Sequence, residues 1–161
     1  MNILYICRGN AFRSLIAEAY TNSLGLPDVV SRSVGTLAVE HKGFNRASYQ
    51  RTHTFLQAHG LEPYAKDHYA DALTQAYIDW ADIVVCLNAV VCAEAKAAHT
   101  LPPSTRIWDV ADMGEPGRIA VTESAKTAAV AAAFTQITRL VDDLVRSKAP
   151  SDLNPDTRSL K

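Results

Sequence analysis

The sequence has few cysteines, and their positions form no recognisable framework. Three occur in 161 residues, at Cys7, Cys86 and Cys92, and their spacing matches neither a disulfide-rich scaffold nor a zinc-binding motif. We interpret Cys86 and Cys92 as small buried residues of the core. An odd number of cysteines without a secretion signal is typical of a reducing compartment, where a reactive thiolate can persist. We therefore expect a cytoplasmic protein without a metal site.

Excess charge and long apolar segments are also missing. Lys and Arg number 16 and Asp and Glu number 17, which gives a net charge of −1. No basic run stands out, so the charge pattern does not point to a nucleic-acid partner. The apolar start is too short for a signal peptide, and no apolar stretch is long enough to span a bilayer. These absences predict a protein that binds neither nucleic acid nor a membrane.

The sequence does contain an alternation of short apolar runs and helical patterns. The runs predict strands at residues 3–6, 29–34, 83–87 and 106–108, and a short extended piece begins at 62–63. Helical spacing predicts helices near 13–25, 46–59, 71–80, 90–99 and 122–146, the last with Thr122 as its N-cap. Such alternation indicates an α/β fold, a parallel sheet with helices on both faces. We expect one domain over residues 1–147 and a flexible C-terminal tail at 148–161.

Between the first strand and the first helix, residues 7–14 read C-R-G-N-A-F-R-S. A helix N-terminus presents unpaired N–H groups and the positive end of the helix dipole, so this turn suits an anion. The same field, with Arg13 nearby, should favour the thiolate form of Cys7. Gly9 and Asn10 tolerate the left-handed backbone that turns loop amides inward. If the spacing of Cys7 and Arg13 arose by chance, Cys7 would be a core residue and Arg13 a solvated one. The strand, loop and helix around them together favour an anion site.

Residues 7–14 resemble the signature loop C-x-G-N-x-x-R-S of the low-molecular-weight protein tyrosine phosphatases and the related thioredoxin-coupled arsenate reductases. The similarity continues through S-V-G-T at residues 33–36, H-G-L at 59–61, H-Y-A at 68–70, A-D-I-V-V at 81–85 and W-D-V-A-D at 108–112. The resemblance implies a three-layer fold with a four-stranded parallel sheet between helices. It also implies a monomer or weak dimer that needs no cofactor and hydrolyses phosphotyrosine in proteins through a cysteinyl-phosphate.

By position, the resemblance makes Cys7 the nucleophile, Arg13 the clamp on the phosphate oxygens and Asp112 the general acid. Asp109 is close enough in sequence to be an alternative acid, although the alignment of Trp108 favours Asp112. The implied phosphate-binding loop comprises Arg8, Gly9, Asn10, Ala11, Phe12 and Arg13. The implied supporting residues are Ser14, which would stabilise the thiolate, and Ser33 and His68, which would hold the loop together with Asn10.

Three positions near the site depart from the family pattern. Met113 replaces the proline usual after the general acid, and no aromatic pair follows it. The loop after Thr36 offers His41, Phe44 or Tyr49 as an aromatic wall for a substrate ring, and Phe44 is our candidate. Arg8 adds a charge to the loop, which would either favour an acidic substrate or extend into water. These departures motivate one alternative function, a catalytically weak phosphoprotein-binding module.

A second alternative is arsenate reduction, in which oxidation passes from the loop thiol to a further pair of cysteines. This chain has Asn88 and Ala95 at the positions where the resemblance would place that pair. Cys86 and Cys92 are out of step with them, which makes a phosphatase the leading hypothesis.

Overall fold

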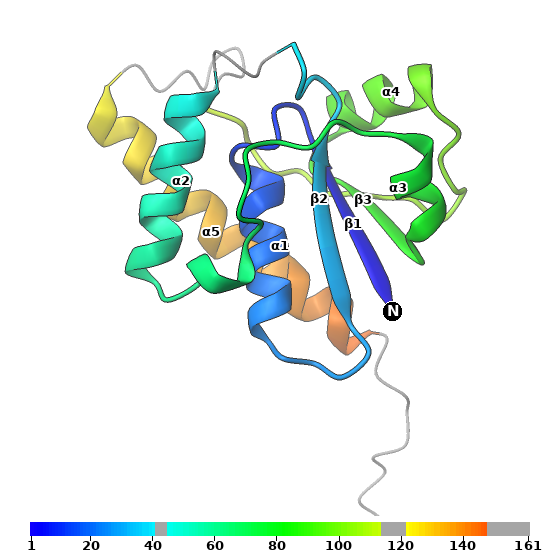
Figure 1. Cartoon of the computed structure of the whole chain (residues 1–161), viewed down its shortest axis with the longest axis horizontal. Helices are drawn as coiled ribbons and strands as arrows, with labels where there is room; N and C mark the ends of the chain where they lie inside the picture. The colour runs from blue at the N-terminus through cyan, green and yellow to red at the C-terminus, as the bar shows by residue number, and fades with distance from the viewer. Residues whose placement is uncertain (41–44, 114–121, 148–161) are drawn as a thin grey trace, which may run out of the picture.

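A four-stranded parallel sheet forms the centre of the computed structural model, which describes residues 1–40, 45–113 and 122–147 (Figure 1). The candidate wall residue Phe44 and the predicted tail at 148–161 lie outside these described residues. The strands are β1 (Asn2–Cys7), β2 (Val30–Gly35), β3 (Ile83–Cys86) and β4 (Arg106–Ile107). Their order is β2-β1-β3-β4, and each neighbouring pair is parallel. The predicted fold class is thus confirmed.

Helices cover both faces of this sheet. On one face lie α1 (Arg13–Ser23) and α5 (Glu123–Arg146), with α2 (Arg46–Ala58) packed against both (Figure 1). The other face carries α3 (Gln75–Trp80) and α4 (Ala89–Ala98). No helix within the described ranges is both long enough and apolar enough to cross a membrane.

Strand β1 separates two hydrophobic cores because its side chains alternate between the faces of the sheet. Ile3, Tyr5 and Cys7 belong to the core under α1 and α5, whereas Leu4 and Ile6 belong to the core under α3 and α4. All five are at most 3% exposed. A strand buried on both faces explains why this run is continuously apolar in the sequence.

Two predicted segments differ from the structure. Residues 62–63 do not begin an extended piece, because Glu62–Tyr64 forms a 3₁₀ turn with a hydrogen bond of 3.1 Å from Ala65 N to Glu62 O. Proline fits the first turn of such a helix, since its missing N–H has no partner there anyway. Helix α3 begins at Gln75 instead of residue 71 because Thr74 caps it and residues 71–73 extend alongside the end of β2.

The start of α1 is capped differently from the starts of the last three helices. Thr74, Asn88 and Thr122 each accept a hydrogen bond from the first turn of α3, α4 and α5, as the N-cap preference predicts. Within the described residues, α1 begins after Phe12 with no side-chain cap. The phenylalanine side chain has no acceptor atom, so α1 starts without a side-chain cap directly after the loop that follows β1.

Gly35, at the end of β2, lets the loop after β1 pass close by. A Cβ atom at this position would lie 2.5 Å from Arg8 O and 2.9 Å from Asn10 N, both backbone atoms that cannot rotate away. The close approach therefore requires glycine here.

We predict that Gly35→Ala lowers the free energy of unfolding by about 1–3 kcal/mol, because the loop must move to admit the methyl group. The measurement is chemical denaturation, combined with the NMR amide shifts of Arg8 and Asn10. Gly60→Ala is the matched control: its φ of +69° strains an alanine, but no heavy atom lies within 4 Å of the added Cβ. The NMR amide shifts of Arg8 and Asn10 should therefore change in Gly35→Ala and not in Gly60→Ala. A Gly35→Ala protein with wild-type stability would contradict the prediction.

Candidate active site

Cys7 ends β1 at the carboxyl edge of the sheet, with its side chain 3% exposed. Its Sγ lies 2.9 Å from Ser14 Oγ, on the first turn of α1, and 3.2 Å from the backbone N of Asn10. In a parallel sheet this edge is where ligands bind. The strand and the helix thus hold a sulfur atom between two hydrogen-bonding groups at the base of a loop.

Asn10 gives the loop its shape. Its φ of +49° lies in the left-handed region, which asparagine tolerates better than most residues. Its amide oxygen accepts from Lys66 Nζ at 3.0 Å and from Asp71 N at 2.8 Å. Because both partners are donors, they determine which way the Asn10 amide faces. Its Nδ2 therefore donates to Ser14 Oγ at 3.0 Å and to Ser33 Oγ at 2.8 Å.

These contacts make the hydrogen bonds around the sulfur directional. The Asn10 amide nitrogen can only donate to Ser14 Oγ, so the Ser14 hydroxyl is left to donate its own proton to Cys7 Sγ. The N–H of Asn10 also points at this sulfur. Two hydrogen-bond donors are thus aimed at one sulfur atom.

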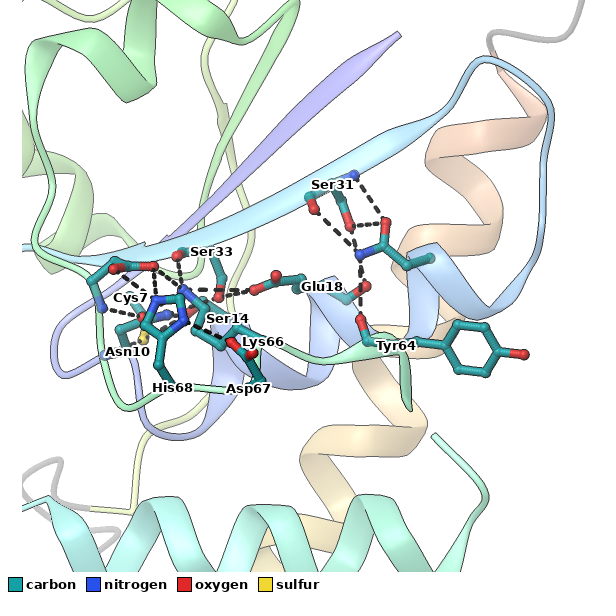
Figure 2. Close-up of polar contacts among 12 residues, drawn as sticks. Cys7, Asn10, Ser14, Glu18, Ser31, Ser33, Tyr64, Lys66, Asp67 and His68 are labelled. Carbon is teal, nitrogen blue, oxygen red and sulfur yellow. Dashed lines mark hydrogen bonds and ion pairs between the residues drawn. The ribbon is translucent and has the colours of Figure 1, made fainter. Parts of the chain in front are cut away.

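The network continues to two charged residues that the sequence analysis missed, Glu18 and Lys66 (Figure 2). The Ser33 hydroxyl donates to the Glu18 carboxylate, and Lys66 Nζ donates to Ser33 O and, at 2.8 Å, to Asp71 Oδ2. Burial raises the pKa of Glu18, against the opposing effect of Lys66, whose Nζ lies 3.8 Å away. Glu18 follows Ser14 by four residues on α1, so helical spacing could have indicated it; nothing in the sequence pattern marks Lys66.

His68 reaches this network through Asp71. Its ring nitrogens lie 3.0 Å from Asp71 Oδ2 and 3.1 Å from Asp67 Oδ1, and its side chain is 57% exposed. Lys66 supplies the direct contact with Asn10 that the resemblance led us to expect of His68.

Arg13 and Asp112 meet at the same edge of the sheet. Arg13 is 1% exposed; its Nη1 donates to Val110 O at 2.8 Å and its Nη2 to Asp112 Oδ2 at 2.6 Å. Met113 N donates to the other carboxylate oxygen at 2.8 Å, which helps to orient Asp112. The guanidinium of Arg13 and the carboxyl group of Asp112, 99 positions apart in the sequence, are thus both positioned beside Cys7.

A cavity of about 330 Å³ brings these groups together. Of the described residues that line it, Asp112 is the only carboxylate. Asp109 is exposed because Trp108 and Val110 turn inward on either side of it. Its backbone oxygen accepts a hydrogen bond from Gln136 of α5. The remaining lining residues are Cys7, Arg8, Gly9, Ala11, Phe12, Arg13, Asn45, Ala47, Ser48, Arg51, Met113 and Lys126.

Arg8 is held on one side of the cavity by an ion pair with α4. Its Nη2 lies 2.7 Å from Glu94 Oε1, and Glu94 also accepts from Thr36 at 2.7 Å. Asn45, Arg51 and Lys126 line the other side, and no sequence motif indicated them. They come from α2, α5 and the residue before α2, so their place in the site depends on helix packing.

Cys86 and Cys92 lie away from this cavity. Both are buried in the core under α3 and α4, whereas Cys7 belongs to the core on the opposite face of the sheet. Burial also raises the pKa of Cys86, which keeps it a thiol. In the parts of the chain that the structure describes, no group of three or more His, Cys, Asp or Glu residues is arranged to hold a metal ion.

Comparison with known proteins identifies the family. The low molecular weight phosphotyrosine protein phosphatase family matches residues 2–107, which include β1, the Cys7 loop, α1 and all four strands. The chain belongs to this phosphatase family. No curated protein matches it significantly.

Solved structures share the fold but differ in their substrates. The YwlE arginine phosphatase from Geobacillus stearothermophilus is 25% identical, with 91% of this chain and 94% of that one covered and a TM-score of 0.56. The low molecular weight protein tyrosine phosphatase from T. tengcongensis is 20% identical, with 91% and 99% covered and a TM-score of 0.65. The thioredoxin-dependent arsenate reductase from Corynebacterium glutamicum is 22% identical, with 91% and 60% covered and a TM-score of 0.61. The shared fold therefore does not select the substrate.

We predict that Lys66→Met slows alkylation of Cys7 by iodoacetamide at neutral pH by about tenfold. Without the ammonium group only the Asp71 N–H still holds the Asn10 amide, so reversal of the amide costs less. In the reversed amide Ser14 loses the donor that directs its hydroxyl to the sulfur. The rate is followed by mass spectrometry of the Cys7 peptide. Lys96→Met, an equal charge change on the exposed face of α4, is the control. Equal alkylation rates in the two variants would show that Lys66 does not orient the loop.

We predict that His68 adds stability at acidic pH and none at alkaline pH. Hydrogen bonds to Asp67 and Asp71 raise the pKa of His68 in the folded protein. The charged imidazole therefore stabilises the fold fully below its unfolded pKa of about 6.5, and this contribution is lost as the pH rises through the raised value. Urea denaturation of His68→Gln and wild type should show a small deficit at pH 5.5 that disappears at pH 9. A deficit of the same size at both pH values would contradict this linkage.

Proposed function

We propose that this protein is a protein tyrosine phosphatase that works through a cysteinyl-phosphate intermediate. The observation that carries the proposal is the arrangement of Cys7, Arg13 and Asp112 around one cavity, with two hydrogen-bond donors on the sulfur. These are a nucleophile, an anion clamp and a proton carrier, the three groups that phosphoryl transfer requires.

In the first step, the Cys7 thiolate attacks phosphorus and the bond from phosphorus to the phenolic oxygen breaks. The loop N–H groups and the Arg13 guanidinium bind the equatorial oxygens, since a planar guanidinium can bind two of them at once. Asp112 gives its proton to the leaving phenolate. Its hydrogen bond to Arg13 holds the carboxyl group beside the clamp; phosphate oxygens would replace it at the guanidinium, and Asp112 could then carry the proton.

In the second step, water attacks phosphorus and passes a proton to the Asp112 carboxylate. The bond between sulfur and phosphorus breaks, its electron pair returns to Cys7, and inorganic phosphate leaves. Ser14 supports both steps, because its hydroxyl stabilises the thiolate when it is the nucleophile and when it is the leaving group.

Apolar side chains in the cavity wall support an aryl substrate. Ala47 and Met113 line the cavity, together with the largely buried loop residues Ala11 and Phe12. A phenyl ring gains free energy from contact with such a wall, whereas a small aliphatic phosphate gains less.

Hydrolysis of phosphoarginine is a second candidate, since the Geobacillus arginine phosphatase shares 25% of its residues with this chain. The same nucleophile and acid could break a bond from phosphorus to nitrogen. However, Asp112 is the only carboxylate among the described residues that line the cavity, and it already pairs with Arg13, so the guanidinium of such a substrate would have little anionic partner there. This charge pattern favours phosphotyrosine.

Arsenate reduction is disfavoured by the positions of the other cysteines. Cys86 and Cys92 lie beneath the opposite face of the sheet, so neither can attack a sulfur adduct on Cys7 without disrupting the core. A non-catalytic phosphoprotein-binding module would share the cavity but show no turnover.

We predict that wild type hydrolyses phosphotyrosine peptides faster than matched phosphoarginine peptides, and that Cys7→Ser removes this activity. Asp112→Asn should lower kcat by about 10²–10⁴-fold, with a larger effect on phenols that are poor leaving groups. Release of phosphate is the measurement. Asp109→Asn is the control for loss of a nearby carboxylate, because Asp109 is exposed outside the cavity.

Three results would argue against the proposal. Full activity in Cys7→Ser would exclude the cysteinyl-phosphate, and equal loss in the two aspartate variants would remove the special role of Asp112. Tight binding of phosphotyrosine peptides by wild type without turnover would favour the binding module.

A further inference from the structure

Two cations from different helices meet at the rim of the cavity. Arg51 of α2 and Lys126 of α5 both line it, and both bind the same carboxylate, that of Glu123. Arg51 Nη2 lies 2.6 Å from Glu123 Oε2, and Lys126 Nζ lies 2.8 Å from Glu123 Oε1. Packing of α2 against α5 therefore creates a point at which two donors converge on one anion.

The bound carboxylate is exposed while its partners are partly covered. The side chain of Glu123 is 72% exposed, compared with 16% for Arg51 and 32% for Lys126. Hydrogen bonds from Lys126 and Arg51 lower the pKa of Glu123, so both cations favour a charged carboxylate at this point. Exposed ion pairs contribute little to stability. Glu123 can therefore exchange for another carboxylate at small cost.

A groove leads away from the cavity past these cations. It holds about 550 Å³ between α2 and α5, and it shares Ala47 and Arg51 with the cavity. Its wall is largely small or apolar; it includes Thr54, Phe55, Ala58, Thr127 and Val130. A peptide whose phosphorylated side chain enters the cavity can thus continue along this groove, with its neighbouring residues beside Arg51.

We propose that Arg51 and Lys126 form an anion subsite that binds an acidic side chain next to the phosphotyrosine of the substrate, in exchange for Glu123. The proposal rests on the proposed function and specifies its substrate class, acidic phosphotyrosine segments. Since the acidic side chain is attached to the bound phosphotyrosine, its effective concentration at the subsite is high. After the exchange both cations remain paired, and the Glu123 carboxylate returns to water.

The experiment compares three phosphotyrosine peptides that differ only in the flanking residues, which are Glu, Gln or Lys. Their Kd values are measured by calorimetry on Cys7→Ser at low salt, and kcat/KM is measured on wild type. We expect the Glu peptide to have a Kd about fivefold lower, and a kcat/KM about fivefold higher, than the Gln peptide. The Lys peptide should be the poorest, and added salt should reduce the differences.

Variants of the three residues should change this preference in opposite directions. Arg51→Gln and Lys126→Gln should bring the ratio of kcat/KM for the Glu peptide to kcat/KM for the Gln peptide towards one. Glu123→Gln should increase the ratio, because the internal competitor is gone. A loss of stability alone could not raise it. Arg139→Gln is the matched control, since it removes one exposed cation from α5 and lies outside both the cavity and the groove.

The outcomes separate this proposal from the proposed function. Selective binding of the Glu peptide without turnover by wild type would support the subsite and overturn the phosphatase activity. Turnover without preference would overturn the subsite alone. A lower ratio in Glu123→Gln would also overturn it, since that result would make the ion pairs a structural clamp. Failure of Cys7→Ser to bind, and of wild type to hydrolyse, any of the three peptides would overturn both.

Discussion

The site depends on the orientation of a single amide, that of Asn10. Its side chain lies between donors on one side, Lys66 and the Asp71 backbone, and hydroxyl groups on the other. Because the donors determine the direction of the amide, they also determine that Ser14 directs its proton at Cys7. A buried network of this kind has one low-energy arrangement when every member is satisfied, so the loop is held ready before an anion arrives.

The same loop requires support from the sheet and from α1. Strand β1 delivers Cys7 to the carboxyl edge, Gly35 allows the loop to pass close to β2, and α1 begins at Arg13 directly after it. Glu18, farther along α1, accepts from Ser33 and approaches Lys66, so the buried charges balance one another behind the loop. The chemistry at Cys7 thus relies on a polar layer built between α1, β2 and the segment before α3.

Much of this arrangement was predictable because it is local in the sequence. The apolar runs indicated all four strands, and the residues from Cys7 to Ser14 indicated a thiol beside an anion site. The contacts of Asn10 with Ser14 and Cys7 lie within the same short stretch, whereas its contacts with Ser33, Lys66 and Asp71 join distant segments. Lys66, Arg51 and Lys126 were not predictable, since each is an ordinary surface residue type in a segment without a motif. The short turn at Glu62–Tyr64 was also missed, because proline fits both extended and 3₁₀ backbone.

The sequence by itself determined the order of strands and helices and the chemical groups of the loop, because hydrophobic periodicity and turn residues act over a few positions. Tertiary structure decided which distant groups join them. Trp108 and Val110 are buried and leave Asp109 exposed between them, whereas Asp112 bonds to Arg13. Packing of α2 on α5 brings Arg51 and Lys126 to one carboxylate at the rim. These pairings connect residues up to 99 positions apart, and the packing of the helices and strands that carry them determines such contacts.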